Sequence, residues 1–73
     1  MSKIVDEMKM NESVQDFARK MKKRMIEKYD AGLRGYDDKA NKDMILANLK
    51  ANVEAGDWVD VGNLAMMMEG FGK

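Results

Sequence analysis

The sequence of 73 residues contains no cysteine, no histidine and no proline. Without cysteine there is no disulfide framework, no thiolate zinc site and no thiol nucleophile. Without histidine the chain lacks the commonest general base and every histidine-containing metal site. These two absences exclude catalysis by Ser-His or Cys-His arrangements. The absence of proline, together with nine methionines, suits long helices with adaptable apolar faces.

Long apolar runs are also missing. The C-terminal apolar segment is interrupted by Asp60 and Asn63 and is too short to span a bilayer. Residues 1–7 lack an apolar core of signal-peptide length, so we expect a cytoplasmic protein with no membrane partner. At this length we expect a single domain, residues 1–73, with a marginal core. Because neither disulfides nor a metal cluster can stabilise it, homo-oligomerisation is the expected supplement.

The spacing of the apolar residues predicts an all-α fold, with two long helices and a C-terminal apolar helix in a small bundle completed by oligomerisation. We expect helices over residues 12–30, 39–55 and 57–70. Residues 1–10 suit either a short helix or a flexible arm. No segment alternates apolar and polar residues at the period of a strand.

The first long helix is capped by Asn11 or Ser13 in this prediction, and Gly32 ends it. Its apolar stripe recurs at steps of three and four residues and comprises Val14, Phe17, Met21, Met25 and Tyr29.

The second long helix begins after a cap at Asp37 or Asp38 and ends at Gly56. Its predicted apolar face comprises Ile45, Leu46, Leu49 and Val53, whereas Asn41, Lys42, Asn48, Lys50 and Asn52 fall largely outside that face.

The third helix starts with Asp57 as N-cap and is apolar on nearly every side, which requires burial. A chain this short has little interior, so the pattern indicates self-association. The small residues Gly62 and Ala65 permit another helix to approach closely. The run Met66–Met68 suits packing, a dimer seam or an adaptable surface for a host protein.

Net charge is zero, but the charges are segregated. Residues 17–28 carry six basic residues against one acidic residue, and residues 54–73 carry four acidic residues against one basic residue. Two interpretations remain open: two solvated faces that attract each other within or between subunits, or a basic surface for a phosphate-bearing ligand or nucleic acid. Direct nucleic-acid binding is the weaker choice, because the basic run is confined to one helix without a DNA-binding motif.

Two stretches of the chain, residues 34–38 (Arg-Gly-Tyr-Asp-Asp) and residues 56–67 (Gly-Asp-Trp-Val-Asp-Val-Gly-Asn-Leu-Ala-Met-Met), carry a family resemblance. Their order around a middle helix resembles small, largely phage-borne relatives of the MazG-like nucleotide pyrophosphohydrolases. The resemblance covers about half of the chain. Enzymes of that family hydrolyse nucleoside triphosphates with magnesium. For this chain the resemblance implies an all-α oligomer, a nucleotide pocket at a helix and subunit interface, and a location in the bacterial host.

Only some of the acidic metal ligands of that family have a counterpart in this sequence. The family holds magnesium with a Glu-x-x-Glu pair on one helix and a Glu-x-x-Asp pair on the next. Asp60 matches the final Asp, and Asp57 stands in place of the preceding Glu. The first pair has no match, and only Glu54 remains as a further metal ligand in the region. Magnesium needs carboxylate oxygens, so the resemblance implies a shortened relative without the hydrolytic site and therefore with no cofactor.

Binding of a nucleotide-like ligand is the function that we expect, with phosphate donors, a base-stacking aromatic and polar groups for the base or ribose. Arg34 offers a forked donor, Lys39 lies in the first turn of a helix, and Tyr36 or Trp58 can stack on a base. The candidate ligand residues are Arg34, Gly35, Tyr36, Lys39, Trp58, Asp60 and Asn63.

Each candidate also has a structural explanation. Arg34 can instead form a surface salt bridge to Asp37 or Asp38. Tyr36 and Trp58 can be core or interface aromatics, and Asp57 can be an N-cap alone. Asp60 lies between valines on an apolar helix, and a buried carboxylate needs a partner. That partner is a basic residue of the first long helix, a ligand group or a metal.

Three functions therefore remain open. The first is a non-enzymatic oligomer that binds a nucleotide-like ligand and sequesters a host-defence signal. The second is an inhibitor that binds a host protein through its basic helix, including Lys22 and Lys23, or through its methionines. The third is a residual magnesium-dependent hydrolase that uses Glu54, Asp57 and Asp60.

Overall fold

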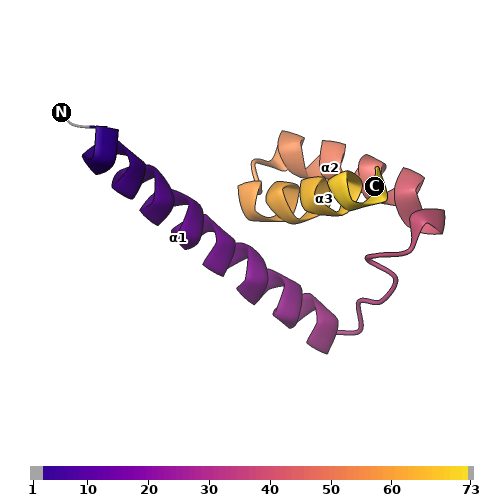
Figure 1. Cartoon of the computed structure of the whole chain (residues 1–73). Coiled ribbons are helices and arrows are strands. Elements are labelled where there is room, and N and C mark those ends of the chain that lie inside the picture. The colour runs from indigo at the N-terminus through magenta and orange to yellow at the C-terminus, as the bar shows by residue number, and fades with distance from the viewer. Residues whose placement is uncertain (1–2, 73) are drawn as a thin grey trace.

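Three α-helices and one short 3-10 helix make up the protein in a computed structural model that describes residues 3–72 (Figure 1). They are α1 (Lys3–Asp30), η1 (Lys39–Asn41), α2 (Lys42–Ala55) and α3 (Trp58–Phe71). The prediction of an all-α fold is confirmed, and residues 3–72 contain no strand. Helices α2 and α3 lie side by side, and the C-terminal half of α1 packs against α3. No helix within residues 3–72 combines the length and apolar character needed to cross a bilayer.

Helix α1 is longer than the sequence predicts. Instead of a separate segment at residues 1–10 and a helix capped at Asn11 or Ser13, one helix runs from Lys3 to Asp30; residues 1–2 lie outside the described part. The physical reason is that residues 3–30 contain no glycine or proline to stop the helix. Asn11 stays within it, with its side-chain oxygen accepting a hydrogen bond from Gln15 one turn later (3.3 Å). Gly32, with φ of +112°, follows as the predicted stop.

Helix α2 begins later than residue 39 because its first turn is the 3-10 helix η1. Asp38 is the cap, and its carboxylate accepts a hydrogen bond from the backbone N–H of Ala40 (2.9 Å). Before it, the linker bends at Gly35, where φ is +77° and an added Cβ would lie 2.7 Å from Nδ2 of Asn41. That same Nδ2 donates to the carbonyl of Gly35 (2.9 Å), so the linker is fastened to the start of α2.

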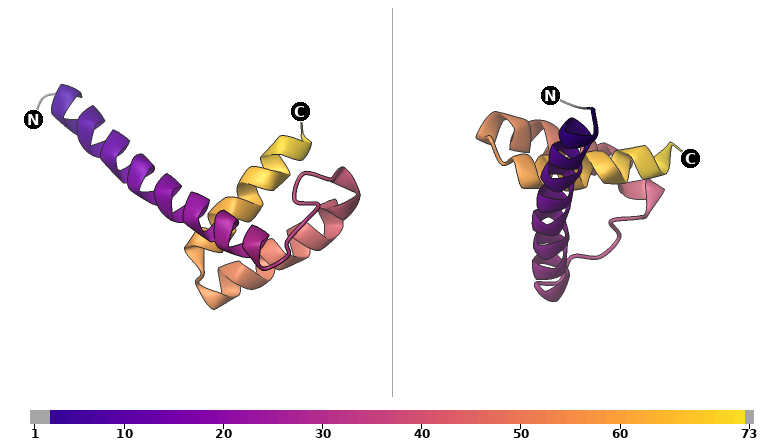
Figure 2. Two further views of the ribbon diagram at one scale, coloured as in Figure 1. Left: turned by 90° about the horizontal axis from the view of Figure 1, so that it is seen from below. Right: turned by 60° about the vertical axis from the view of Figure 1, so that its left-hand side comes forward.

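The turn between α2 and α3 follows the sequence prediction closely. Gly56 adopts the left-handed conformation that ends α2. Asp57 is the N-cap of α3, because its side chain accepts a hydrogen bond from the N–H of Asp60 (3.2 Å). The short turn makes α2 and α3 neighbours, and the left view of Figure 2 shows the two helices leaving this turn at an angle.

The apolar core is thin. Within residues 3–72 only Ile45 and Met67 are buried apolar residues, and they are joined by the buried polar residues Asp60 and Asn63. Val53, predicted on the apolar face of α2, is exposed. Helix α3 is not buried on every side within one chain, because residues such as Trp58 and Met66 remain exposed.

Helix α1 lies close against α3 at Gly62. A Cβ added there would lie 2.7 Å from Cε2 of Phe17 and 3.2 Å from Sδ of Met21. A side chain at this position would therefore force Phe17 or Met21 to move, which confirms the expected role of a small residue. Ala65, the second small residue of the prediction, is exposed instead.

Candidate functional site

A cavity of about 350 Å³ lies between α2, α3, the end of α1 and the linker that follows it. This volume falls at the low end of the range for small-molecule sites, roughly 300–1,000 Å³. Its wall combines apolar side chains, including Met25, Ile45 and Met67, with two cationic residues, Lys28 and Arg34. A wall that combines cations and polar groups with apolar side chains is what a site for a phosphate-bearing organic molecule requires.

Five of the seven candidate ligand residues line this cavity: Arg34, Gly35, Tyr36, Asp60 and Asn63. They come from the linker and from α3, which lie far apart in the sequence. The other two candidates do not line it. Lys39 is exposed on η1, and Trp58 borders a separate groove beside Phe17.

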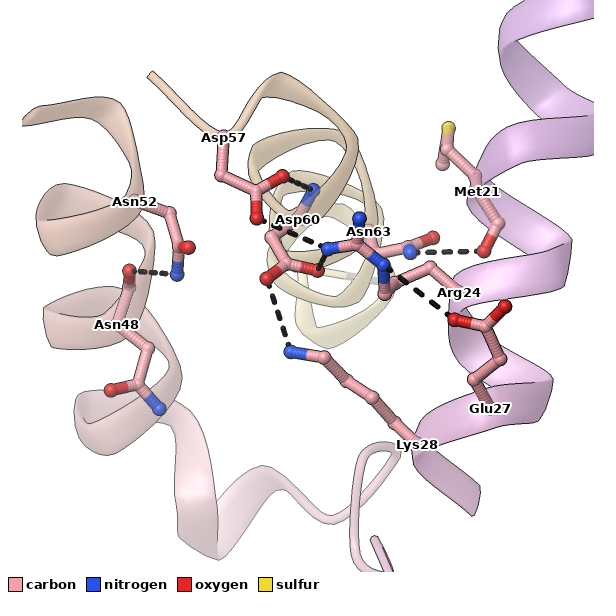
Figure 3. Close-up of polar contacts among 9 residues, drawn as sticks. All are labelled: Met21, Arg24, Glu27, Lys28, Asn48, Asn52, Asp57, Asp60 and Asn63. Atoms are coloured by element: carbon pink, nitrogen blue, oxygen red, sulfur yellow. Dashed lines mark hydrogen bonds and ion pairs between the residues drawn. The ribbon is translucent and has the colours of Figure 1, made fainter. Parts of the chain in front are cut away.

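Arg24 and Lys28 of α1 converge on the buried carboxylate of Asp60 (Figure 3). Arg24 Nη1 donates to Asp60 Oδ1 at 3.0 Å, and Lys28 Nζ donates to Asp60 Oδ2 at 3.1 Å. Arg24 Nη1 also donates to Asp57 Oδ2 at 3.1 Å. The sequence left three kinds of partner open for Asp60: a basic residue, a ligand group or a metal. In the structure the partners of Asp60 are basic residues of α1. These ion pairs hold α1 against α3 and satisfy the buried charge.

The pKa values of this cluster reflect the same contacts. The pKa of the Arg24 guanidinium is raised, mainly by its hydrogen bond to Asp57 and then by the negative charges of Asp57 and Asp60. The pKa of Asp57 is lowered, mainly by the hydrogen bond that it accepts from the backbone N–H of Asp60 and then by Arg24. Asp57 is thus an N-cap and also an ion-pair partner, so neither role alone describes it.

Arg34 does not form the ion pair with Asp37 or Asp38 that the sequence permits. Its guanidinium stacks over the ring of Tyr29 at 3.7 Å from the centroid. Its Nη1 donates to the carbonyls of Tyr29 and Leu33, each at 2.8 Å. A guanidinium has five N–H donors, and within residues 3–72 the donors on Nε and Nη2 make no hydrogen bond. Arg34 is therefore held in place while keeping donors for an anion.

Three asparagines give the cavity its neutral polar groups. Asn63 is 3% exposed, and its Nδ2 donates to the carbonyl of Met21 (3.0 Å). Its Oδ1 is buried and has no hydrogen-bond partner within residues 3–72, which is costly for an amide oxygen. Asn48 and Asn52 lie on the neighbouring turns of α2, where Asn52 Nδ2 donates to the carbonyl of Asn48 (2.8 Å; Figure 3).

Sequence reasoning missed Lys28, Asn48 and Asn52 as lining residues. The two asparagines were placed largely outside the apolar face of the second helix, whereas they face the cavity beside Ile45. Their spacing of four residues, one helical turn, is the signal that could have placed both on one side of α2. Lys28 was visible only as part of the basic run.

Asp57 and Asp60, two of the three tentative metal ligands, are both hydrogen-bonded to Arg24 Nη1. The guanidinium thus occupies the position between the carboxylates that a bridging cation would need. Within residues 3–72, no group of three or more acidic residues is arranged to hold a metal ion. The acidic side chains present therefore do not fit the magnesium site of the MazG-like family.

No protein-family model, no curated protein and no solved structure matches this chain. The resemblance to the MazG-like pyrophosphohydrolases consequently stays a prediction.

Proposed function

We propose that the protein binds a nucleotide-like, phosphate-bearing small molecule in the cavity between the linker, α2 and α3, without transforming it chemically. The observation that carries this proposal is the convergence of Arg34, Lys28 and Tyr36 with asparagine amides on one cavity. The free guanidinium donors suit phosphate, the aromatic ring suits a base, and amides suit base edges or ribose hydroxyls.

Several further properties belong to the same proposal. The protein is a homo-oligomer located in the cytoplasm of a bacterial host, and it sequesters its ligand as a nucleotide signal. The involvement of Asp57 and Asp60 with Arg24 favours binding over the hydrolase alternative, because neither carboxylate is left for a metal. The ligand must compete with Asp60 for the ammonium group of Lys28. Because salt screens the attraction between the phosphate and this cation, the affinity is expected to fall as the salt concentration rises.

Native mass spectrometry of the freshly purified full chain is the first experiment. A nucleotide-sized mass that is retained in the native state and released on denaturation supports the proposal and identifies the ligand class. If no mass is retained, calorimetric titration with AMP, ADP, ATP and their guanine counterparts follows. Absence of both a retained mass and any binding heat would overturn the proposal and favour the protein-binding inhibitor.

Variants then locate the site. Arg34→Ala should lower the affinity for the bound nucleotide at least tenfold, and Asn48→Ala, at an exposed side chain of the wall, should lower it less. Lys50→Ala is the matched control, because Lys50 is an exposed cation of α2 that does not line the cavity. Far-UV circular dichroism checks that each variant is folded. Equal affinity losses in Arg34→Ala and Lys50→Ala would place binding elsewhere.

A further inference from the structure

The face of α1 that packs on α3 continues toward the N-terminus of α1, beyond the point where the two helices cross. Phe17 and Met21 contact the Gly62 surface, and the same stripe extends through Val14 and Met10 at steps of three and four residues. Figure 1 and the left view of Figure 2 show the N-terminal half of α1 projecting away from the other helices. Met10 and Val14 are accordingly 63% and 67% exposed. The N-terminal part of the stripe is therefore an exposed row of apolar side chains, and contiguous exposed apolar surface is typical of an interface.

A groove adjoins this stripe at the beginning of α3. It is lined by Phe17, Lys20 and Arg24 of α1 and by the segment from Ala55 to Val59. Trp58 borders the groove and is 59% exposed. Aromatic side chains are enriched in interface cores. Phe17 belongs to both the stripe and the groove, so the two adjoin, and we call their apolar residues the α1 surface (Met10, Val14, Phe17 and Trp58).

The charge of α1 changes sign along its length. Residues 3–16 carry four acidic residues against two basic ones, and residues 17–28 carry six basic residues against one acidic one. Arg24 and Lys28 are neutralised by α3 of the same chain, whereas Lys20, Lys22 and Lys23 form no ion pair within residues 3–72. A second α1 in antiparallel orientation would place its acidic half beside Lys20, which lines the groove next to the stripe, and this contact would occur in both copies. A parallel orientation would place like charges together.

We infer that two copies of this chain form a two-fold dimer in which the α1 helices pair antiparallel through the α1 surface. The N-terminal half of each α1 covers Phe17 and the Trp58 groove of the other copy. The interface is isologous, since the same residues contribute from both copies. Burial of these apolar residues supplements a core that contains only two buried apolar residues within residues 3–72.

Sedimentation velocity of the full chain tests the interface. The wild type should sediment with twice the chain mass of 8.3 kDa, or an even multiple of it. Val14→Asp should raise the dissociation constant at least tenfold. Ile26→Asp is the matched control, because Ile26 is also exposed on α1 (51%) but lies on another side of the helix, and it should leave the constant unchanged. A monomeric wild type, or equal effects of the two variants, would overturn the inference.

Disulfide cross-linking tests the orientation, because the chain has no cysteine of its own. Met10→Cys and Ala18→Cys proteins are mixed and oxidised, and the products are separated by mass. Antiparallel pairing predicts mainly the mixed disulfide between positions 10 and 18. Disulfides of each variant with itself would indicate parallel pairing and overturn the inference. Neither position lines the ligand cavity, so a failed interface leaves the nucleotide-binding proposal to its own test.

Discussion

The close approach of α1 to α3 at Gly62 predicts how two alanine substitutions in α3 differ. In Gly62→Ala the new methyl group would lie 2.7 Å from the Phe17 ring and 3.2 Å from the Met21 sulfur. Phe17 is 37% exposed as a residue, so its ring has room to move outward, and the overpacking cost should be near the low end of its range, about 1 kcal/mol. Replacing glycine by alanine in a helix gains about 1 kcal/mol, so the two effects nearly cancel.

Gly70→Ala is the matched control in the same helix. An added Cβ at Gly70 meets no atom within 4 Å, so only the gain in helix propensity applies. We therefore expect Gly70→Ala to be more stable than Gly62→Ala by about 1 kcal/mol, or about 4–8 °C in Tm for a domain of this size.

Thermal unfolding followed by far-UV circular dichroism measures this difference. Both variants must be compared at one protein concentration, because oligomerisation makes Tm depend on concentration. If Gly62→Ala raised Tm as much as Gly70→Ala, the side chains of α1 would not lie against Gly62, and the docking of α1 on α3 described above would be wrong.

Three other predictions address the charge cluster and the core. Because the pKa of Asp57 is lowered in the folded state, the stability that its charge contributes is present above its unfolded pKa, near 3.8, and is lost as pH falls through the folded pKa. Urea unfolding at a series of acid pH values measures this loss, and Asp57→Asn should make the free energy of unfolding depend less on pH. Ile45→Ala removes a buried side chain and should lower the free energy of unfolding by about 2–5 kcal/mol. Met44→Ala removes an exposed side chain and should change it by about 0.5 kcal/mol or less, so equal losses would contradict the position of the core. With magnesium and ATP we expect no release of pyrophosphate, and turnover that Asp60→Asn abolishes would instead support the hydrolase.

Local sequence signals predicted most of the helix ends. Asp57, Gly32 and Gly56 act through their own backbone geometry or through a side chain that bonds within one turn, so they are readable from the sequence. The start of α1 was predicted wrongly, because Asn11 and Ser13 favour caps yet are also tolerated inside a helix. Without glycine or proline nearby, nothing in the local sequence decides between these roles.

The candidate site was only partly predictable, because it depends on contacts between distant segments. The chemistry of Arg34 and Tyr36 could be recognised in the turn itself. The partners of Asp60 lie 32 and 36 residues earlier in the chain, so the charge pattern indicated their type but left their identity open. Asn63 illustrates the limit most clearly, since its amide bonds to the carbonyl of Met21, 42 residues away.

The segregated charge of α1 connects the two proposals. Because Arg24 and Lys28 both end on Asp60, the C-terminal half of α1 is fastened to α3, and Lys28 is thereby placed in the cavity wall. The acidic N-terminal half finds no such partner on α3 and projects away from it, which leaves the α1 surface for a second copy. Arg24 has no place in the cavity wall, so it can keep α1 docked when a phosphate draws Lys28 away from Asp60. The ion pairs of Arg24 would thus allow the proposed ligand binding and the proposed dimerisation to occur together on one helix.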